Sequence, residues 1–396
     1  MDTESVLESL AVVCLGLVAY SYCAYPICVL LWAAVKQVVS DGAYVLRKRD
    51  RRAACMDRLP SVAVVVSAYN EEAHIGARIE NLLAADYPRE LLRVYVGSDG
   101  SRDGTSAVIH AHEGPRVRCF TFPDNRGKAS VLNDLIEGTD EEILVFTDAN
   151  SMFEPTSIRF LVAGFADPAT GCVCGELRLA GGKGDNQDSV YWRVEQFLKF
   201  CESRIGGLLG ANGAIYAIRR RLWQPLRADT ICDDFTISMR IAATGLRLLY
   251  QPEAIAREVT PGAIREEYRR RIRIGIGNFQ VLARHPDFLF RTSFSTAFTY
   301  FSHKVLRWIT PHLIVLGLVA SVLLSSTSTM WLVSSVLLSA GLLLSATSFA
   351  LTLRHREVPR VLRIPAFLFA LNWGFMVASA LYVTGRYRGS WQRSER

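Results

Sequence analysis

Long stretches without a charged residue stand at both ends of the chain. The first covers residues 9–35, which exceeds the roughly 20 apolar residues that a helix needs to cross a bilayer. No small-residue cleavage site follows it, so we predict a retained transmembrane helix within residues 1–40. The C-terminal third predicts three more such helices within residues 309–385, at about 309–325, 330–353 and 364–384.

Between these ends, residues 59–260 alternate short β-branched runs with amphipathic segments. Residues 61–66 read Ser-Val-Ala-Val-Val-Val, which is typical of a strand buried on both faces. The same pattern continues with helices over 72–84, 103–112 and 128–136 and strands over 93–97, 116–122 and 143–146. This alternation indicates an α/β domain with a doubly wound, mostly parallel sheet.

Charge orients the predicted membrane helices. Acidic residues precede the first apolar stretch and a run of lysine and arginine follows it, so the positive-inside rule places the α/β domain in the cytosol. A neutral link at 326–329 and an arginine-rich link after residue 353 agree with this order of spans. The basic tail, residues 386–396, should then lie outside, against its own charge.

Composition adds that half of the residues are hydrophobic and that the net charge is +7, more apolar than an ordinary soluble enzyme. Nine cysteines are scattered without CxxC pairs, which indicates free thiols in a reducing compartment. Residues 261–308 form an amphipathic interface region that contains Arg270 and Arg273. These arginines either lie on anionic membrane lipid or clamp a nucleotide diphosphate; we expect no nucleic acid partner.

Polar residues follow the predicted strands, where ligands of open α/β sheets bind. Asp148 and Asn150 follow the strand over 143–146, and a carboxylate there can hold a divalent cation against phosphate oxygens; the alternative is a simple turn. Lys128 begins a helix, where it favours phosphate unless it is an exposed loop lysine. Asp99 either accepts from a pyrimidine ring NH or forms an Asp-Gly turn.

Two adjacent carboxylates, Asp233 and Asp234, stand at the start of a predicted helix. The helix dipole favours acidic residues there, so capping explains one of them. The other can act as a general base that removes the proton of an attacking hydroxyl. We assign the base to Asp234, with Asp233 as the alternative.

The order of these features resembles the membrane-bound family 2 glycosyltransferases, such as hyaluronan, chitin-oligosaccharide, poly-N-acetylglucosamine and cellulose synthases. The matching segments are 67–71, 98–101, 127–129, 148–150, 210–213 and 233–234. The resemblance implies a GT-A fold, a UDP-sugar donor, Mg²⁺ or Mn²⁺, inversion at the anomeric carbon, and a bacterial inner or plasma membrane. It further implies nucleoside contacts from Tyr69, Asn70, Glu71 and Asp99, a metal site at Asp148 and Asn150, and an acceptor site at Gly210, Asn212 and Gly213.

The chain departs from this family at two motifs. Asp-x-Asp appears as Asp-Ala-Asn, and Gln-x-x-Arg-Trp appears as Arg-Arg-Ile-Arg-Ile over 270–274. Trp308 could replace the missing acceptor-stacking tryptophan, or it could be an interfacial anchor. Three functions remain open: a polysaccharide synthase, a transferase adding one sugar to a lipid carrier or lipid-linked glycan, and an inactive subunit or transporter.

Overall fold

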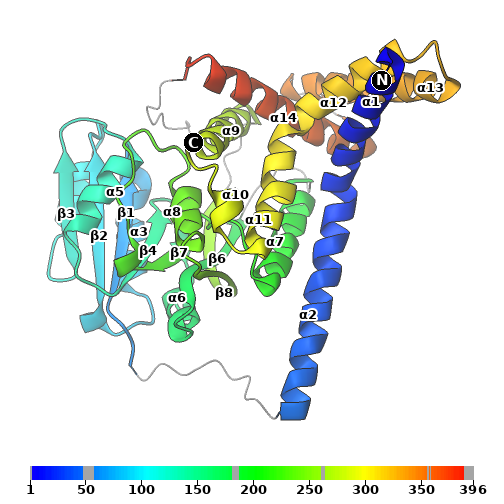
Figure 1. Ribbon diagram of the computed structural model, residues 1–396. Helices are drawn as coiled ribbons and strands as arrows, with labels where there is room; N and C mark the ends of the chain where they lie inside the picture. Colours follow the sequence, from blue (N-terminus) through cyan, green and yellow to red (C-terminus); the bar gives the residue numbers. More distant parts are fainter. Residues whose placement is uncertain are drawn as a thin grey trace.

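The computed structural model describes residues 2–47, 58–180, 187–259, 264–354, 356 and 358–387. The predicted basic tail, apart from its first two residues, lies outside the described residues. Figure 1 shows an α/β domain, with its sheet on the left, beside a group of long helices. The domain and the helices meet along α7 (Gln187–Ile205) and α9 (Ile264–Arg284).

Within the described residues, the α/β domain is built on an eight-stranded sheet of order β3-β2-β1-β4-β7-β6-β8-β5. Strands β3, β2, β1 and β4 are parallel, whereas β7 is antiparallel to both β4 and β6. Strand β8 is parallel to β6 and antiparallel to β5. The predicted mostly parallel sheet is therefore confirmed. The strands are β1 Val62–Ala68, β2 Leu92–Asp99, β3 Val117–Phe122, β4 Ile143–Asp148, β5 Met152–Phe153, β6 Thr170–Ala180, β7 Tyr216–Arg219 and β8 Arg247–Val259.

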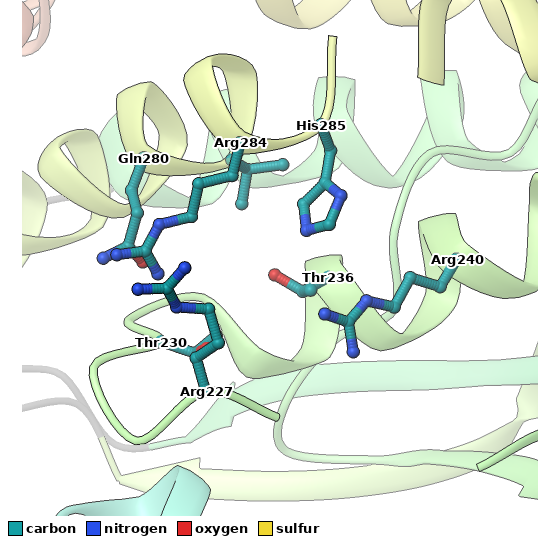
Figure 2. A pocket seen from close by; sticks show the side chains of 8 residues that line it. Arg227, Thr230, Thr236, Arg240, Gln280, Arg284 and His285 are labelled. Carbon is teal, nitrogen blue, oxygen red and sulfur yellow. The ribbon is translucent and has the colours of Figure 1, made fainter. Parts of the chain in front are cut away.

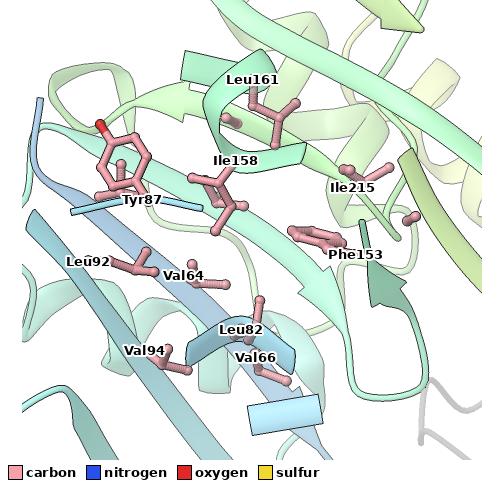
Figure 3. Packing of buried hydrophobic residues seen from close by; sticks show 14 of the residues in the cluster. Val64, Val66, Leu82, Tyr87, Leu92, Val94, Phe153, Ile158, Leu161 and Ile215 are labelled. Carbon is pink, nitrogen blue, oxygen red and sulfur yellow. The ribbon is translucent and has the colours of Figure 1, made fainter. Parts of the chain in front are cut away.

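Both faces of the central strands are buried, which explains their unbroken apolar sequence. Val62, Val64 and Val66 of β1 join one hydrophobic cluster, and Ala63 and Val65 join the other. Helices α3, α4 and α6 pack on the first face, and α5 and α8 pack on the second. Figure 3 shows Leu82 of α3 and Ile158 and Leu161 of α6 in the first cluster. These helices are α3 Glu72–Leu83, α4 Thr105–Ala111, α5 Lys128–Glu137, α6 Ser157–Ala163 and α8 Asp233–Ala242.

Among the described residues, four helical stretches are long and apolar enough to cross a membrane: Thr3–Leu46, Phe294–Leu323, Thr329–Leu353 and Val361–Val383. The first consists of α1 Thr3–Ala19, the π-helical η1 Tyr20–Ala24 and α2 Tyr25–Arg47. The second consists of α11 Phe294–Thr299, the π-helical η5 Tyr300–Val305 and α12 Leu306–Leu323. The last two belong to α13 Thr329–Leu353 and α14 Arg360–Val383, and the short α10 Phe288–Arg291 precedes α11.

The second of these stretches begins earlier than the sequence predicts. The interface region is expected to extend to residue 308, yet one helix continues from Phe294 to Leu323. Two of the polar residues that end the apolar run, His303 and Arg307, have a partner inside the protein, because Glu195 of α7 contacts both. Paired charges are tolerated in an apolar helix that unpaired ones would interrupt.

The amphipathic segment after the sheet is α9, which lies between the domain and α14 (Figure 1). Two glycines allow close packing on both sides. A Cβ added at Gly275 would lie 2.8 Å from Ala378 Cβ, and one added at Gly277 would lie 2.5 Å from Cys232 Sγ. Helix α9 is therefore wedged between α14 and the start of α8.

Candidate active site

The carboxyl ends of the parallel strands meet at one edge of the sheet. Ser67 of β1 lies opposite Asp148 of β4, and Ala68 lies opposite Ser98 of β2. The strand order reverses between β1 and β4, which is where open α/β sheets bind ligands. The residues that follow β1, β2 and β4 therefore border one site.

Lys128 lies at the centre of this edge. It is the first residue of α5, and its Nζ lies 2.9 Å from Asp148 Oδ1 and 3.3 Å from Asp233 Oδ2. Asp148 ends β4 and Asp233 begins α8, so three distant segments of the chain meet at one ammonium group. The Lys128 side chain is only 18% exposed, which does not fit an exposed loop lysine.

Asp99 holds this lysine in place rather than facing a nucleobase. Its Oδ1 accepts a hydrogen bond from the Arg126 backbone N–H at 2.8 Å, and its Oδ2 accepts one from Gly127 at 2.9 Å. Asp99 is fully buried, so the predicted contact with a pyrimidine ring does not fit the structure. Gly127 has a φ of 88°, which a residue with a side chain rarely adopts. Asp99 thus fixes the turn that brings Lys128 into the site.

Asp234 faces the site across the backbone of Gly213. A Cβ added at Gly213 would lie 3.3 Å from Asp234 Oδ2 and 3.9 Å from Asp148 Oδ2. The other oxygen, Asp234 Oδ1, accepts the backbone N–H of Phe235 at 2.7 Å. Oδ2, which faces Gly213, is therefore the oxygen placed to act on a ligand, and a side chain at position 213 would crowd it.

The loop that carries Gly213 is fixed at two further points. Gly210 has a φ of 68°, and a Cβ there would come 2.5 Å from the Phe235 ring. The backbone N–H of Asn212 donates to Cys174 Sγ at 3.3 Å. The segment predicted as the acceptor site therefore runs directly past the two carboxylates of the site.

The carboxyl groups of this site differ in pKa. Burial and the charge of Asp233 raise the pKa of Asp234 to about 6, against the opposing charge of Lys128. Burial also acts upward on Asp148, but Lys128 and two arginines of α9 outweigh it and hold the pKa of Asp148 below its ordinary value. Asp148 is therefore ionised at neutral pH, whereas Asp234 exchanges its proton close to neutral pH.

The arginine side chains of α9 lie on two sides of the helix, one towards the site and one towards α14. Arg270 and Arg273 are the ones whose charges lower the pKa of Asp148, so they lie on the side of the site. Arg271 instead lies over the ring of Phe367 in α14, 4.9 Å from its centroid. The basic segment thus faces both the site and the apolar helices, with different residues on each side.

A basic cleft between α8 and α9 shows how α9 is held (Figure 2). Gln280 accepts the Ile231 backbone N–H at 3.1 Å and donates to the Asp229 carbonyl at 2.9 Å. Arg284 pairs with the Asp229 carboxylate. The cleft has a volume of about 10 Å³, enough for about one water molecule. It is a seam that sets the position of α9, and with it that of Arg270 and Arg273. Its lining residues are Arg227, Thr230, Thr236, Arg240, Gln280, Val281, Arg284 and His285.

The residues after β1 are tied to the loop after β2. Asn70 has a φ of 54°, its Oδ1 accepts the Arg102 backbone N–H at 2.8 Å, and its own N–H donates to Ser101 Oγ at 3.1 Å. Glu71 is buried and Tyr69 is half-buried. These bonds hold the segment predicted to contact a nucleoside at the same edge as Asp148.

Two predicted site residues are engaged elsewhere. Asn150 Nδ2 donates to Glu258 Oε1 at 3.0 Å, so its amide nitrogen is directed to β8. Trp308 is 2% exposed, and its ring packs 6.2 Å from Phe235 and 5.9 Å from Tyr300 between centroids. Neither an acceptor platform nor an interfacial anchor fits this burial. The tryptophan instead supports the start of α8 from behind.

Two buried polar residues beside the site belong to no predicted motif. Arg78 of α3 is fully buried and donates to Thr147 Oγ1 at 2.8 Å, directly before Asp148. Burial lowers the pKa of Arg78 to about 9, against the charge of Asp148. Tyr216 of β7 is also buried and stacks on Phe146, with 4.6 Å between centroids. Of the two, only Arg78 could have been found from the sequence, because a charged residue on the apolar stripe of an amphipathic helix is unexpected.

Residues 60–277, more than half of the chain, match the family described as "Glycosyltransferase like family 2". The poly-beta-1,6-N-acetyl-D-glucosamine synthase of Staphylococcus aureus (strain COL) is 24% identical over 242 residues, which cover 58% of this chain and 57% of that protein. The synthase of the same description from Staphylococcus epidermidis is 23% identical over 237 residues, 57% of each chain. The match thus spans little more than half the length of these relatives.

Among solved structures, the chain is similar to a mannosyltransferase, PcManGT from Pyrobaculum calidifontis, in complex with GDP-Man and Mn²⁺. The TM-score is 0.71 with 22% identity, over 96% of this chain and all of the other. This similarity shows a shared GT-A fold. The chain therefore belongs to glycosyltransferase family 2 and joins a GT-A domain to helices long enough to span a membrane.

Proposed function

We propose that this protein transfers a sugar, with inversion, from a UDP-sugar to a saccharide acceptor at the cytosolic face of a membrane, in the synthesis of an oligosaccharide or polysaccharide. The observation that carries the proposal is that two carboxylates beside Lys128 differ in pKa. One carboxylate beside it, Asp148, is held ionised, and another, Asp234, has its pKa raised to about 6. A transferase of this type needs both an anionic ligand and a base.

The residues present fit a divalent cation at Asp148. Its side chain is 37% exposed, and Lys128 contacts Oδ1 while Oδ2 lies towards Gly213. Hard carboxylate oxygens suit Mg²⁺ or Mn²⁺. Asn150 would contribute through its side-chain carbonyl oxygen, since its amide nitrogen Nδ2 donates a hydrogen bond to Glu258. When bound, such an ion supplies charge that stabilises the departing diphosphate.

The cationic side chains around Asp148 are placed to bind a diphosphate. Lys128 lies at the N-terminus of α5, where helix N–H groups favour phosphate. Arg270 and Arg273 approach from α9, and guanidinium groups bind phosphate through two donors at once. Tyr69, Asn70 and Glu71 border the same edge and would face the nucleoside.

Asp234 would act as the base through Oδ2. The acceptor hydroxyl gives its proton to this oxygen while its own oxygen bonds to the anomeric carbon. The bond from that carbon to the diphosphate oxygen breaks on the opposite face, which inverts the configuration. Asp233 is less suited to this step, because its carboxylate lies 3.3 Å from the Lys128 ammonium group.

A second candidate is the transfer of a single sugar to a lipid carrier or lipid-linked glycan. The relatives named above are polymer synthases, but two observations favour short products here. Ile274 stands where the processive motif has tryptophan, and it is 38% exposed. Trp308 is buried, so it offers no stacking surface that would retain a growing chain.

The test is incubation of the purified full-length protein with a panel of UDP-sugars and Mn²⁺. GDP-mannose forms a separate arm, because the structural neighbour was solved with it. Release of nucleoside diphosphate identifies the donor, and product size separates polymer from single addition. Asp148→Asn is the inactive control. No release above that control with any UDP-sugar would contradict the proposal, and release only with GDP-mannose would reassign the donor.

A further inference from the structure

Three side chains with metal-binding atoms gather at the outer edge of the sheet. His110 lies in the last turn of α4, Glu113 follows that helix, and Cys119 stands in β3. Their ligand atoms, one from each residue, all lie within 4.8 Å of one another. Strand β3 is the edge strand on the left of the sheet in Figure 1, three strands from β4. This cluster is therefore roughly 14 Å or more from the strand that carries Asp148.

A single short stretch of chain builds the cluster. Helix α4 reverses into β3 through a turn in which the backbone N–H groups of Gly114 and Val117 each donate to the carbonyl of the other at 3.1 Å. His110 and Glu113 are three residues apart, which places side chains on one face of a helical turn. Cys119 points to the face of the sheet that α4 covers, since it packs against that hydrophobic cluster. The turn therefore brings the thiol beside the two polar side chains.

The imidazole ring of His110 has a different partner at each nitrogen. Its Nε2 lies 2.9 Å from Thr121 Oγ1, and its Nδ1 lies 3.4 Å from Glu113 Oε2. A histidine that binds a metal through one nitrogen almost always gives the other to a hydrogen-bond partner, which fixes the ring. Thr121 can serve as that partner, and Nδ1 is then the nitrogen directed towards the carboxylate.

A metal ion fits among the three ligand atoms after small movements of their side chains. Because no two of these atoms are more than 4.8 Å apart, one point lies within about 2.8 Å of all three (4.8 Å divided by √3). Zinc binds nitrogen, oxygen and sulfur at about 2.0–2.3 Å, so each atom has to move by less than about 1 Å. The side chains of His110 and Glu113 are 49% and 56% exposed, which leaves them room to turn.

The cluster holds two groups that repel each other when both are ionised. Burial, and then the charge of Glu113, raises the pKa of the Cys119 thiol to about 11. At neutral pH the thiol is therefore protonated, and it donates to the Ile109 carbonyl at 3.2 Å. A divalent cation between the sulfur and the carboxylate would displace this proton to solvent, because cysteine binds metals as the thiolate.

The donor set selects one class of metal. Magnesium and manganese prefer oxygen ligands, whereas a thiolate with an imidazole and a carboxylate suits zinc. Zinc is four-coordinate in most protein sites, and the exposure of Glu113 leaves the fourth position to water. The ligand chemistry of this cluster therefore differs from that of the Asp148 site, where the donors are oxygen atoms.

We propose that His110, Glu113 and Cys119 bind a zinc ion that ties the end of α4 to the edge strand β3. The proposal is independent of the proposed sugar transfer, since the cluster lies away from the catalytic edge of the sheet. An edge strand has unpaired backbone groups along one side and lacks a second neighbouring strand. A metal bound only by the folded chain stabilises the fold, and here it would do so at this strand.

The test titrates the purified full-length protein, prepared without a histidine tag and treated with a chelator, first with Co²⁺ and then with Zn²⁺. Cobalt bound by a thiolate gives a charge-transfer absorption band, which zinc abolishes when it displaces the cobalt. We expect this band in the wild type and its loss in Cys119→Ser. His110→Gln and Glu113→Gln should each weaken binding by about tenfold or more.

Two pairs of variants separate a built site from chance binding. Thr121→Val removes the hydroxyl that holds the imidazole and should weaken binding about tenfold, whereas Thr121→Ser keeps the hydroxyl and should bind as the wild type does. His112→Gln is the matched control for His110→Gln, because His112 also lies near a glutamate, 3.8 Å from Glu80. It should leave binding unchanged. Zinc should raise the Tm of the wild type and not that of Cys119→Ser.

Three outcomes would overturn the proposal. The first is a wild type without the band, and the second is a band that persists in Cys119→Ser, which would assign it to another thiol. The third is equal affinity of the wild type, His110→Gln and Glu113→Gln, which would leave a lone thiol as the ligand. These titrations use neither a nucleotide sugar nor turnover, so their failure is distinguishable from a failure of the donor panel.

Discussion

Replacing Asp234 with asparagine should abolish sugar transfer and at the same time stabilise the fold. Loss of a general base typically lowers the rate by about two to four orders of magnitude. The pKa of Asp234 rises from 3.8 to about 6 on folding, and a difference of this size corresponds to about 3 kcal/mol at neutral pH. Asp234 is partly exposed, so solvent screening reduces the expected gain to between about 1 and 3 kcal/mol.

The gain should depend on pH in a defined direction. A carboxyl group with a higher pKa in the folded chain binds its proton more tightly there, so it favours folding at low pH and loses that contribution as the pH rises through about 6. The stability difference between Asp234→Asn and the wild type should therefore be absent below about pH 4 and complete above about pH 7.

Thermal unfolding in detergent between pH 4 and pH 8, followed by intrinsic fluorescence, measures this difference, and nucleoside diphosphate release measures activity. Each 1 kcal/mol should move Tm by roughly 2 °C or slightly more. Asp233→Asn is the matched control, because it removes a contact of Lys128 and should lower Tm. An Asp234→Asn variant that is less stable than the wild type at pH 7.5, or whose Tm difference does not change with pH, would refute this account of the site.

Three further changes test other parts of the site. Asp148→Asn should abolish transfer, while Asn150→Asp should preserve or raise it by adding a carboxylate; near-normal release of diphosphate by Asp148→Asn with Mn²⁺ would exclude a metal at that residue. Gly213→Ala places a Cβ 3.3 Å from Asp234 Oδ2 and should slow transfer about tenfold with an unchanged Tm. Trp308→Ala should cost about 3–5 kcal/mol of stability, and an unaltered Tm would contradict its burial.

The secondary structure of the sheet domain is predictable from sequence because its signals are local. The apolar run over 61–66 corresponds to β1, Val62–Ala68, since a strand buried on both faces needs no polar alternation. The helix expected over 128–136 is α5, Lys128–Glu137. The carboxyl edge of the sheet follows from this alternation alone, so the neighbourhood of Asp148 and Lys128 is also foreseeable.

The roles of individual polar residues, in contrast, cannot be predicted from the local sequence. The carboxylate of Asp99 accepts hydrogen bonds from the backbone of the turn over 125–127. A search for short motifs does not link these two segments of the chain. The helix from Phe294 runs through its charged stretch because its partners, such as Glu195, lie about 110 residues earlier in the chain. Trp308 is covered by Phe235 of a different helix. Each of these outcomes depends on tertiary packing that no short window of sequence contains.

The pair Asp233-Asp234 shows how packing decides what sequence leaves open. On the chain the two residues are equivalent, since either could cap α8 and either could be the base. In the fold, one helix start presents them in different directions: Asp233 turns to Lys128 at 3.3 Å, and Asp234 turns its Oδ2 to Gly213. The ammonium group offsets the charge of the nearer carboxylate, while that carboxylate raises the pKa of its neighbour. Burial and the adjacent carboxylate of Asp233 thus raise the pKa of Asp234, while Lys128, held by Asp99 through the turn before α5, pairs with Asp233.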